Sequence, residues 1–569
     1  MITKKIRKHM TTWCFSLCLP ALTISNVCFG GQGVVYLDQG WTPQQRQAFY
    51  ETPQGSYLIP LKWFLALEQP QNRKLFSSPS HIKSFNYLLV ADDDLHDDDN
   101  KSVVPLGFAV EPVSPGDDWL GYTCSACHTN DIVFRGERIR VDGAPTLADF
   151  SGFIAQLQKS VEATLQDDAK FARFAERVLG DSADAQAPGL RDELADYSQT
   201  LAGFVARNQT AEPYGYARLD AFGIIMNEVF GDDLHYSGNI KEPNAPVSYP
   251  FLWGTPQHDW VQWNGSANNP IGRNVGEVLG TFGAVNLVDP QQLGHGTARG
   301  KELIELENLV AGLKTPQWPE DILGKIDPDK AARGKVIYQQ FRGDEPSCAY
   351  CHALKDASGS YPLTPAEENY FGVQFVETEM TPLAEIGTDP TMAMNFAART
   401  VSTAHLAPVL PAPFTGAAEL PAPVLLGILV GLATQNTLAS IDPPLSQAQT
   451  AAAIGYRVKA PGLPPYTPKN LLAYRARPLD GIWATAPYLH NGSVRTLYQM
   501  LLPGEQRETI FYVGSRRFDA KYVGFENRKS PNTSKLDVSA PGNSNLGHEY
   551  GTTLSDEERW DLIEFLKTL

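Results

Sequence analysis

The sequence predicts a mainly α-helical protein of two domains, with long irregular loops and little β-sheet. Three observations favour this fold class. One five-residue motif occurs twice, at 124–128 and 348–352. Capped, amphipathic helix patterns stand before the second copy and at the C-terminal end. The 47 glycines and 42 prolines follow no repeating period, which predicts long loops between the helices.

The composition is that of a chain that forms a core, and its charge excludes several partners. Of 569 residues, 43% are hydrophobic and 20% are charged. The formal net charge is −17. Nucleic acids and anionic membranes are bound by basic surfaces, so no nucleic acid is expected as a partner. No stretch after the first 30 residues has the roughly 20 apolar residues of a spanning helix, so no stable membrane insertion is expected.

Residues 1–30 predict a secretory signal peptide. Four basic residues within 4–8 precede an apolar stretch from Thr11 to Val27, and cleavage is expected after Gly30. A retained membrane anchor is the alternative. The mature protein is therefore expected to be periplasmic or secreted.

Residues 31–312 are predicted to form the first domain, around the first motif. Cys-Ser-Ala-Cys-His at 124–128 matches C-x-x-C-H, the attachment sequence of a c-type haem. Cys124 and Cys127 would bond to the haem, and His128 would bind its iron. A disulfide, a zinc site and a thioredoxin-like redox pair are the alternatives. Zinc would need the two motifs to converge, and a redox pair would not need a histidine after both.

Two other segments of this domain are informative. Residues 218–230 have helical apolar spacing and predict a core helix near the haem. The acidic run at 92–99 could hold Ca²⁺, although it lacks the glycine and the closing Glu of an EF-hand loop. A solvated acidic loop is the alternative.

A proline-punctuated segment, 313–326, is predicted to link this domain to a second one at 327–569. Asp327 suits the N-cap, and Pro328 the first position, of a helix that reaches about Phe341. A helix that leads directly into C-x-x-C-H is the arrangement of cytochrome c, so both domains are expected to be cytochrome c-like.

The second motif predicts a second haem c, held by Cys348 and Cys351 with His352 as the iron ligand. The chain ends in a predicted helix, for which Ser555 and Glu558 form a capping box.

The sixth coordination position decides what each iron does. An iron with two protein ligands transfers electrons, whereas an open one can bind O₂ or peroxide. After His128 the next histidine is 107 residues away, at His235, which favours an open first haem. Histidine and methionine are the candidate sixth ligands, and for the second haem His548 and His490 are favoured.

Four segments resemble the RoxA-type rubber oxygenases: residues 36–69, 124–128, 486–493 and 545–551. That group belongs to the bacterial dihaem cytochrome c peroxidase superfamily, which also contains the MauG-type enzymes that oxidise a partner protein. The resemblance covers nearly all of the mature chain. It implies a five-coordinate catalytic haem with His128 as the proximal ligand. It also implies a six-coordinate electron-transfer haem with His352 and His548 as the axial pair, and His490 is the alternative to His548.

The resemblance also nominates residues at the open face of the first haem. Peroxidase relatives carry a Trp-Asp-Gly motif and a catalytic Glu downstream; here Asn264 replaces that Asp, and Glu277 follows. Rubber oxygenases are thought to use aromatic residues at this face, which nominates Trp260 and Phe282. Core packing is the alternative role for these aromatic residues.

The expected function is that of an exported dihaem oxidoreductase. Its open N-terminal haem would activate O₂ to cleave an apolar alkene such as polyisoprene, and its C-terminal haem would transfer electrons. One alternative is a peroxidase that uses H₂O₂, or a MauG-like enzyme that oxidises a redox partner protein. Another is a non-catalytic electron carrier with two six-coordinate haems. The alkene rests on the resemblance alone.

Overall fold

The computed structural model describes residues 33–90, 102–114, 116–268, 270–369, 371–455 and 471–569. The predicted signal peptide and the acidic run at 92–99 lie outside these ranges. Within them, helices account for 42% of the residues and strands for 15%. The strands pair into small sheets of two or three strands each. The prediction of a mainly α fold with little β-sheet is therefore wrong.

The correction concerns mainly the first motif, which lies between strands and not between helices. One sheet has the order β2 (Ile59–Pro60), β4 (Asp117–Tyr122), β3 (Phe108–Ser114), and the other β1 (Val34–Tyr36), β6 (Glu137–Asp142), β5 (Thr129–Phe134). The motif helix α4 (Cys124–Cys127) connects β4 to β5. The β-branched side chains of β5 and β6 favour a pleated strand, which explains why this region is not helical.

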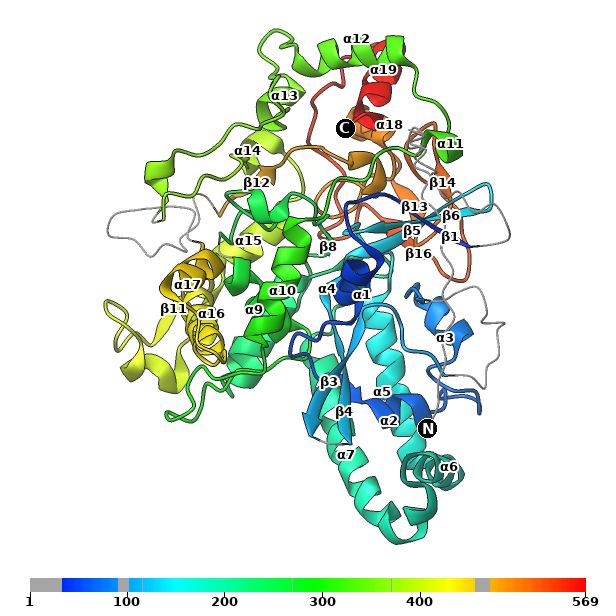
Figure 1. The fold of residues 1–569 in the computed structure, drawn as a ribbon, viewed down its shortest axis with the longest axis vertical. Coiled ribbons are helices and arrows are strands. Elements are labelled where there is room, and N and C mark those ends of the chain that lie inside the picture. Colours follow the sequence, from blue (N-terminus) through cyan, green and yellow to red (C-terminus); the bar gives the residue numbers. More distant parts are fainter. Residues whose placement is uncertain (1–32, 91–101, 115, 269, 370, 456–470) are drawn as a thin grey trace, which may run out of the picture.

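Helices surround these two sheets. On the N-terminal side they are α1 (Pro43–Glu51), α2 (Leu61–Ala66), α3 (Pro79–Ser84), α5 (Phe150–Gln166), α6 (Asp168–Leu179) and α7 (Ala183–Arg207). Helices α5, α6 and α7 form a bundle at the lower end of the molecule (Figure 1).

The region predicted as a core helix at 218–230 begins later than expected. Strand β7 (Arg218–Leu219) comes first, and α8 (Ala221–Asn227) then starts with Asp220 as its N-cap. A π-helical turn, Glu228–Asp233, continues α8. Strand β7 pairs with β8 (Val247–Ser248).

A second group of helices packs against α8 and supplies one wall of the site described below. It consists of α9 (Pro270–Gly280), α10 (Gly300–Ala311), α15 (Thr391–Ala398), α16 (Ala422–Ala439) and α17 (Gln447–Ile454). Helix α16 is long and apolar enough to cross a membrane, by length and composition only. Its Leu425 and Leu429 are nevertheless buried in a core cluster with Val278 of α9, as in a core helix.

The C-terminal part contains the two helices that the sequence predicts, one before the second motif and one at the end of the chain. Helix α12 (Pro328–Gln339) begins after Asp327, whose side chain accepts from two main-chain N–H groups. Helix α19 (Asp556–Lys567) begins with the capping box of Ser555 and Glu558. Both predicted starts are confirmed. The two helices cross at the top of Figure 1, next to α13 (Cys348–Cys351), which carries the second motif.

The remaining elements of this part are short. They are α11 (Glu320–Leu323), β9 (Glu379–Pro382), α14 (Leu383–Ile386), β10 (Thr400–Ser402), β11 (Glu419–Pro421), β12 (Ala473–Ala476), α18 (Leu497–Met500), β13 (Ile510–Val513), β14 (Phe518–Asp519), β15 (Gly524–Phe525) and β16 (Ser534–Asp537). Strand β12 pairs with β9 in antiparallel register.

The predicted linker at 313–326 packs into the interior. Leu313, Trp318 and Leu323 are buried in a core cluster whose members come from both sides of the predicted linker, including Phe49 and Phe565. The N-terminal and C-terminal parts therefore share one core, and the domain boundaries stay a prediction.

Candidate haem sites

Each C-x-x-C-H motif lines a cavity of its own. The N-terminal cavity, of about 150 Å³, has Cys124, Cys127 and His128 in its wall. The C-terminal cavity, of about 220 Å³, has the second motif in its wall. The motifs do not converge on one site, as a four-ligand zinc centre formed by both would require.

The local fold of both motifs is the same. In each, the main-chain N–H of the histidine donates to the carbonyl of the first cysteine, His128 to Cys124 at 2.9 Å and His352 to Cys348 at 2.8 Å. This single turn brings both thiols and the imidazole to the wall of one cavity. All four cysteines are free, so neither motif forms a disulfide.

The thiols do not have the properties of a thioredoxin-like redox pair. Burial raises the pKa of Cys124 and Cys127 to about 12 and that of Cys348 and Cys351 to about 11. Reactive redox cysteines have a lowered pKa, because the thiolate is the nucleophile. These neutral, enclosed thiols suit covalent attachment of a ligand within the cavity better than exchange with other thiols.

In the N-terminal cavity, His128 is the histidine that lies in the wall. Burial lowers the pKa of His128 to about 4, although the carbonyl of Pro250 acts in the opposite direction. The imidazole is thus neutral at pH 7, which is the form that binds a metal. Among the described residues that line this cavity there is no second histidine and no methionine.

Polar side chains from α9 and its neighbours occupy part of this cavity. Gln262 donates from Nε2 to Oε1 of Glu277 at 3.0 Å, and the Nε of Arg273 lies 3.9 Å from the same oxygen. Arg273 also pairs with Glu307 at 2.7 Å. Desolvation raises the pKa of Glu277, with Arg273 and Gln262 acting against it. The side chain of Glu277 is 41% exposed, which reflects the space of the cavity in front of it.

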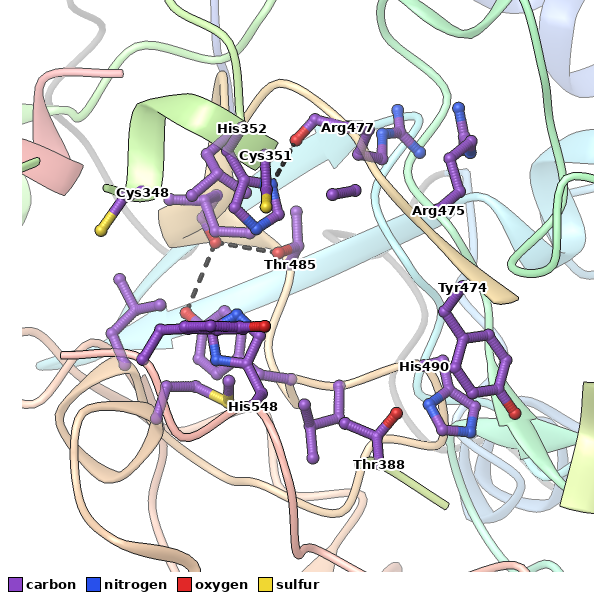
Figure 2. A pocket seen from close by; sticks show the side chains of 18 of the residues that line it. Cys348, Cys351, His352, Thr388, Tyr474, Arg475, Arg477, Thr485, His490 and His548 are labelled. Atoms are coloured by element: carbon purple, nitrogen blue, oxygen red, sulfur yellow. Dashed lines mark hydrogen bonds between the residues drawn. The ribbon is translucent and has the colours of Figure 1, made fainter. Parts of the chain in front are cut away.

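The C-terminal cavity places a second histidine opposite the motif (Figure 2). The Nδ1 of His352 bonds to the main-chain carbonyl of Arg477 at 2.7 Å, which leaves Nε2 as the ligating nitrogen. The ring centres of His352 and His548 are 6.3 Å apart, with 42° between the ring planes. Burial lowers the pKa of His548 to about 3, so this imidazole is also neutral.

The loop that carries His548 is held by main-chain contacts. The N–H of His548 donates to Ile386 O at 2.7 Å, and Arg507 donates to the carbonyls of Asn545, Gly547 and His548. His548 itself has φ +49, a region that residues other than glycine seldom occupy. The surrounding contacts therefore fix a conformation that turns this imidazole into the cavity.

His490 lines the same cavity but is held differently. Its ring stacks on Tyr474, with 4.0 Å between the ring centres, and its carbonyl accepts from the N–H of Ser248 at 2.8 Å. His548, and not His490, therefore lies opposite His352.

These residues fit a covalently held haem. Metal–imidazole bonds are about 2.0–2.1 Å long, so two imidazoles that bind one ion from opposite sides have ring centres roughly 6 Å apart. The separation of His352 and His548 agrees with that value. In the N-terminal cavity the thiols of Cys124 and Cys127 would attach a haem, and the neutral His128 would bind its iron.

The two cavities have a common wall. Six residues line both: Ser248, Tyr249, Pro250, Trp263, Arg475 and Arg477. Trp263 is fixed by its indole N–H, which donates to the carbonyl of Ser248 at 2.9 Å. The wall therefore places an indole ring between the two candidate haem sites.

The three predicted catalytic residues are placed differently from one another. Glu277 lines the N-terminal cavity. Trp260 is buried without lining a described cavity, and its carbonyl accepts from Arg475 at 2.7 Å. Phe282 follows the end of α9 and stacks on Phe204, with 4.4 Å between the ring centres. The structure therefore does not bring Trp260 or Phe282 to the cavity with Glu277.

The sequence reasoning missed Trp263 and the two arginines of the wall. Trp263 stands directly before Asn264, the residue that replaces the Asp of the peroxidase motif, so this position carried a signal. Arg475 lies in the short strand β12 and Arg477 follows its end, and two charges so close together in an otherwise apolar segment are unusual.

Comparison with known proteins supports the assignment to a haem protein. Residues 473–512 match a family model described as RoxA-like, cytochrome c-like. This segment begins with β12 and includes Tyr474, both arginines of the wall and His490. The match indicates a haem oxidoreductase that carries haem c.

Two relatives from Sinorhizobium fredii (strain NBRC 101917 / NGR234) have names without a function. The uncharacterized protein y4iM is 24% identical over 357 residues, which cover 58% of this chain and 67% of y4iM. The uncharacterized protein y4iJ is 32% identical over 589 residues, which cover 94% of this chain and 93% of y4iJ. The chain thus belongs to the same family as y4iJ, and in residues 473–512 it has the RoxA-like, cytochrome c-like segment.

Proposed function

We propose that the protein is an exported dihaem c-type oxidoreductase with one open and one closed iron. This proposal rests on a difference between the two cavities in the number of iron ligands that they offer. The C-terminal cavity offers His548 at 6.3 Å from His352, measured between ring centres. The described wall of the N-terminal cavity offers no histidine or methionine besides His128. Export rests on the signal pattern of residues 1–30.

The open haem would supply redox chemistry on O₂ or peroxide, and the closed haem would exchange electrons with it. The chain's own residues have separate tasks. His128 and His352 would bind the irons, and His548 would complete the second site. Trp263 lines both cavities and would lie between the two haems. A soluble redox partner protein would deliver or remove electrons at the C-terminal side.

An apolar alkene, such as a polyisoprene chain, is our proposed substrate. The N-terminal cavity supports it, because the walls contain Phe222, Ile224, Ile225 and Val261. Such walls admit a hydrocarbon and keep bulk water from the reacting centre. O₂ would then be the second substrate.

A second candidate is a peroxidase that uses H₂O₂. The observation that favours it is Glu277, a carboxyl group in the same cavity as His128, because cleavage of an O–O bond requires a group that moves a proton. Its raised pKa keeps the protonated form available closer to neutral pH.

The first test is the number and spin state of the haems in the purified protein. The absorbance of the pyridine haemochrome and the mass of the protein should each correspond to two covalently bound haems per chain. Low-temperature paramagnetic resonance of the ferric protein should give one low-spin signal that added imidazole leaves unchanged. A second signal should be high-spin and convert to low-spin with imidazole. Two inert low-spin signals would exclude an open iron and favour an electron carrier.

A further inference from the structure

Two arginines in the wall between the cavities have no role in the function proposed above. Arg475 is in β12, and Arg477 follows this strand. Residues two apart in a strand point to the same face, and the side chains of both arginines line both cavities. Their exposed fractions are only 7% and 4%. Figure 2 shows them beyond His352, on the side of the C-terminal cavity away from His548.

Within the described part of the chain, neither guanidinium forms an ion pair with a carboxylate. Arg475 donates from Nη1 to the carbonyl of Trp260 at 2.7 Å and lies 3.2 Å from His258 Nδ1. Arg477 donates to the carbonyl of Phe251 at 2.9 Å, and its guanidinium lies 3.4 Å from the centre of that ring. The Nε atoms of both arginines are buried without a hydrogen-bond partner among the described residues.

Burial of two guanidinium cations without an anion is energetically unfavourable. Desolvation of a charge is offset only when an opposite charge and further hydrogen bonds accompany it. Arg140, which is fully buried, has such a partner and binds Asp131 at 2.8 Å, whereas the buried Arg218 has only neutral acceptors. Arg475 and Arg477 differ from Arg218 because they lie two residues apart and line both cavities, so an anionic group fits beside them. Planar carboxylates match the fork of a guanidinium.

We propose that Arg475 and Arg477 bind the propionate carboxylates of the haems held by the two motifs. This inference rests on the proposed function, because it takes its ligand from there. The porphyrin of a haem carries two propionates, and each motif fixes one porphyrin in a cavity that both arginines reach. One short segment would thus neutralise acidic groups of both haems. Through its main-chain carbonyl, Arg477 also orients His352.

The test measures the reduction midpoint potentials of the two haems by spectroelectrochemistry in the full-length holoprotein. The variants are Arg475→Gln, Arg477→Gln and the charge-conserving Arg475→Lys and Arg477→Lys. Arg218→Gln is the matched control: Arg218 is also buried without a carboxylate partner but lines neither cavity, and it donates to Asn543 Oδ1 at 2.6 Å. The haem count and the ferric spin states of every variant show whether the iron sites are intact.

With two haems and unchanged spin states, each Gln variant should lower at least one midpoint potential, because loss of a nearby cation favours the ferric state. The Lys variants should restore much of the shift, and Arg218→Gln should leave both potentials at their wild-type values. Wild-type potentials in both Gln variants would overturn the inference while the proposed function stands. A shift of the midpoint potentials of the wild-type protein on addition of acetate would also overturn it. Such a shift would mean that the two guanidinium groups bind anions from solution and are not occupied by propionates. A protein without covalent haem would refute the proposed function itself, and this inference with it.

Discussion

The crossing of α12 and α19 frames the C-terminal site and allows a quantitative prediction for Gly334→Ala. A methyl group on Gly334 would lie 2.0 Å from the carbonyl oxygen of Asp561 and 2.8 Å from Cβ of Phe565. Ordinary contacts of a Cβ atom begin at 3.4 Å, so the helices would have to separate by more than about 1 Å. Overpacking of this kind costs roughly 1–3 kcal/mol, and the better helix propensity of alanine returns about 1 kcal/mol. Because the 2.0 Å contact is with a main-chain oxygen, the cost lies at the upper end of that range, and we expect a net loss of about 2 kcal/mol.

The separation of α12 and α19 should also disturb the candidate haem site. Tyr338 of α12 donates to the carbonyl of His352 at 2.7 Å, and Arg333 pairs with Asp561 at 2.7 Å from both of its donor atoms. The assay is denaturation of the holoprotein by guanidinium chloride, followed by far-UV circular dichroism and by absorption in the Soret band. The midpoint should fall in both signals.

Gly189→Ala is the matched control for Gly334→Ala. Gly189 lies in α7, and nothing is within 4 Å of the position that its Cβ would take. There alanine should stabilise the protein by roughly 0.4–1 kcal/mol, because it restricts the unfolded chain and favours the helix. The reasoning is refuted if Gly334→Ala is as stable as the wild type, or if both variants change stability in the same direction.

Three further predictions concern the iron ligand His548, the proton-moving group Glu277 and the pH dependence of stability. His548→Ala should convert one of two ferric haems from low-spin to high-spin, whereas His490→Ala should not, because only His548 lies opposite His352. Glu277→Gln should lower turnover of O₂ or peroxide roughly 10²-fold or more, through loss of the proton-moving group. Burial raises the pKa of Asp220 from 3.8 to about 6, so the folded state binds more protons than the unfolded state between these values. This carboxyl group should therefore lower the stability by up to about 3 kcal/mol as the pH rises from 4 to 6, a loss that Asp220→Asn removes.

Each of these has a check of its own. Added imidazole should return the low-spin signal of His548→Ala, and an unchanged signal in that variant would transfer the ligand role to His490 or a methionine. Glu277→Gln should keep the wild-type spin states, and full turnover would exclude the acid–base role. For Asp220→Asn, the fall in unfolding free energy between pH 4 and pH 6 should become smaller; an identical profile would show that this carboxyl group does not titrate there. Asp220 accepts from Gly223 N–H with Oδ1 and from Ala245 N–H with Oδ2. Asn keeps only one of these acceptors, so Asp220→Asn should also lower the stability by an amount that does not depend on pH.

The sequence by itself determined the features that depend on residues a few positions apart. The two C-x-x-C-H motifs, the N-cap at Asp327 and the capping box at Ser555 are such features, because hydrogen bonds within one turn define them. Even the choice of His548 over His490 was indicated by a resemblance of the local segment, and the structure then places His548 opposite His352.

Only the tertiary structure decided the small sheets and the wall between the cavities. Strand β1 pairs with β6, so that Val34 lies beside Arg138, and Trp263 meets Arg475 and Arg477 across more than 200 residues of chain. No local pattern encodes such partners, because they depend on how distant segments pack into one core. The same reason explains Phe282: its ring does not line the N-terminal cavity, but stacks on Phe204 and on Tyr122, which does line it.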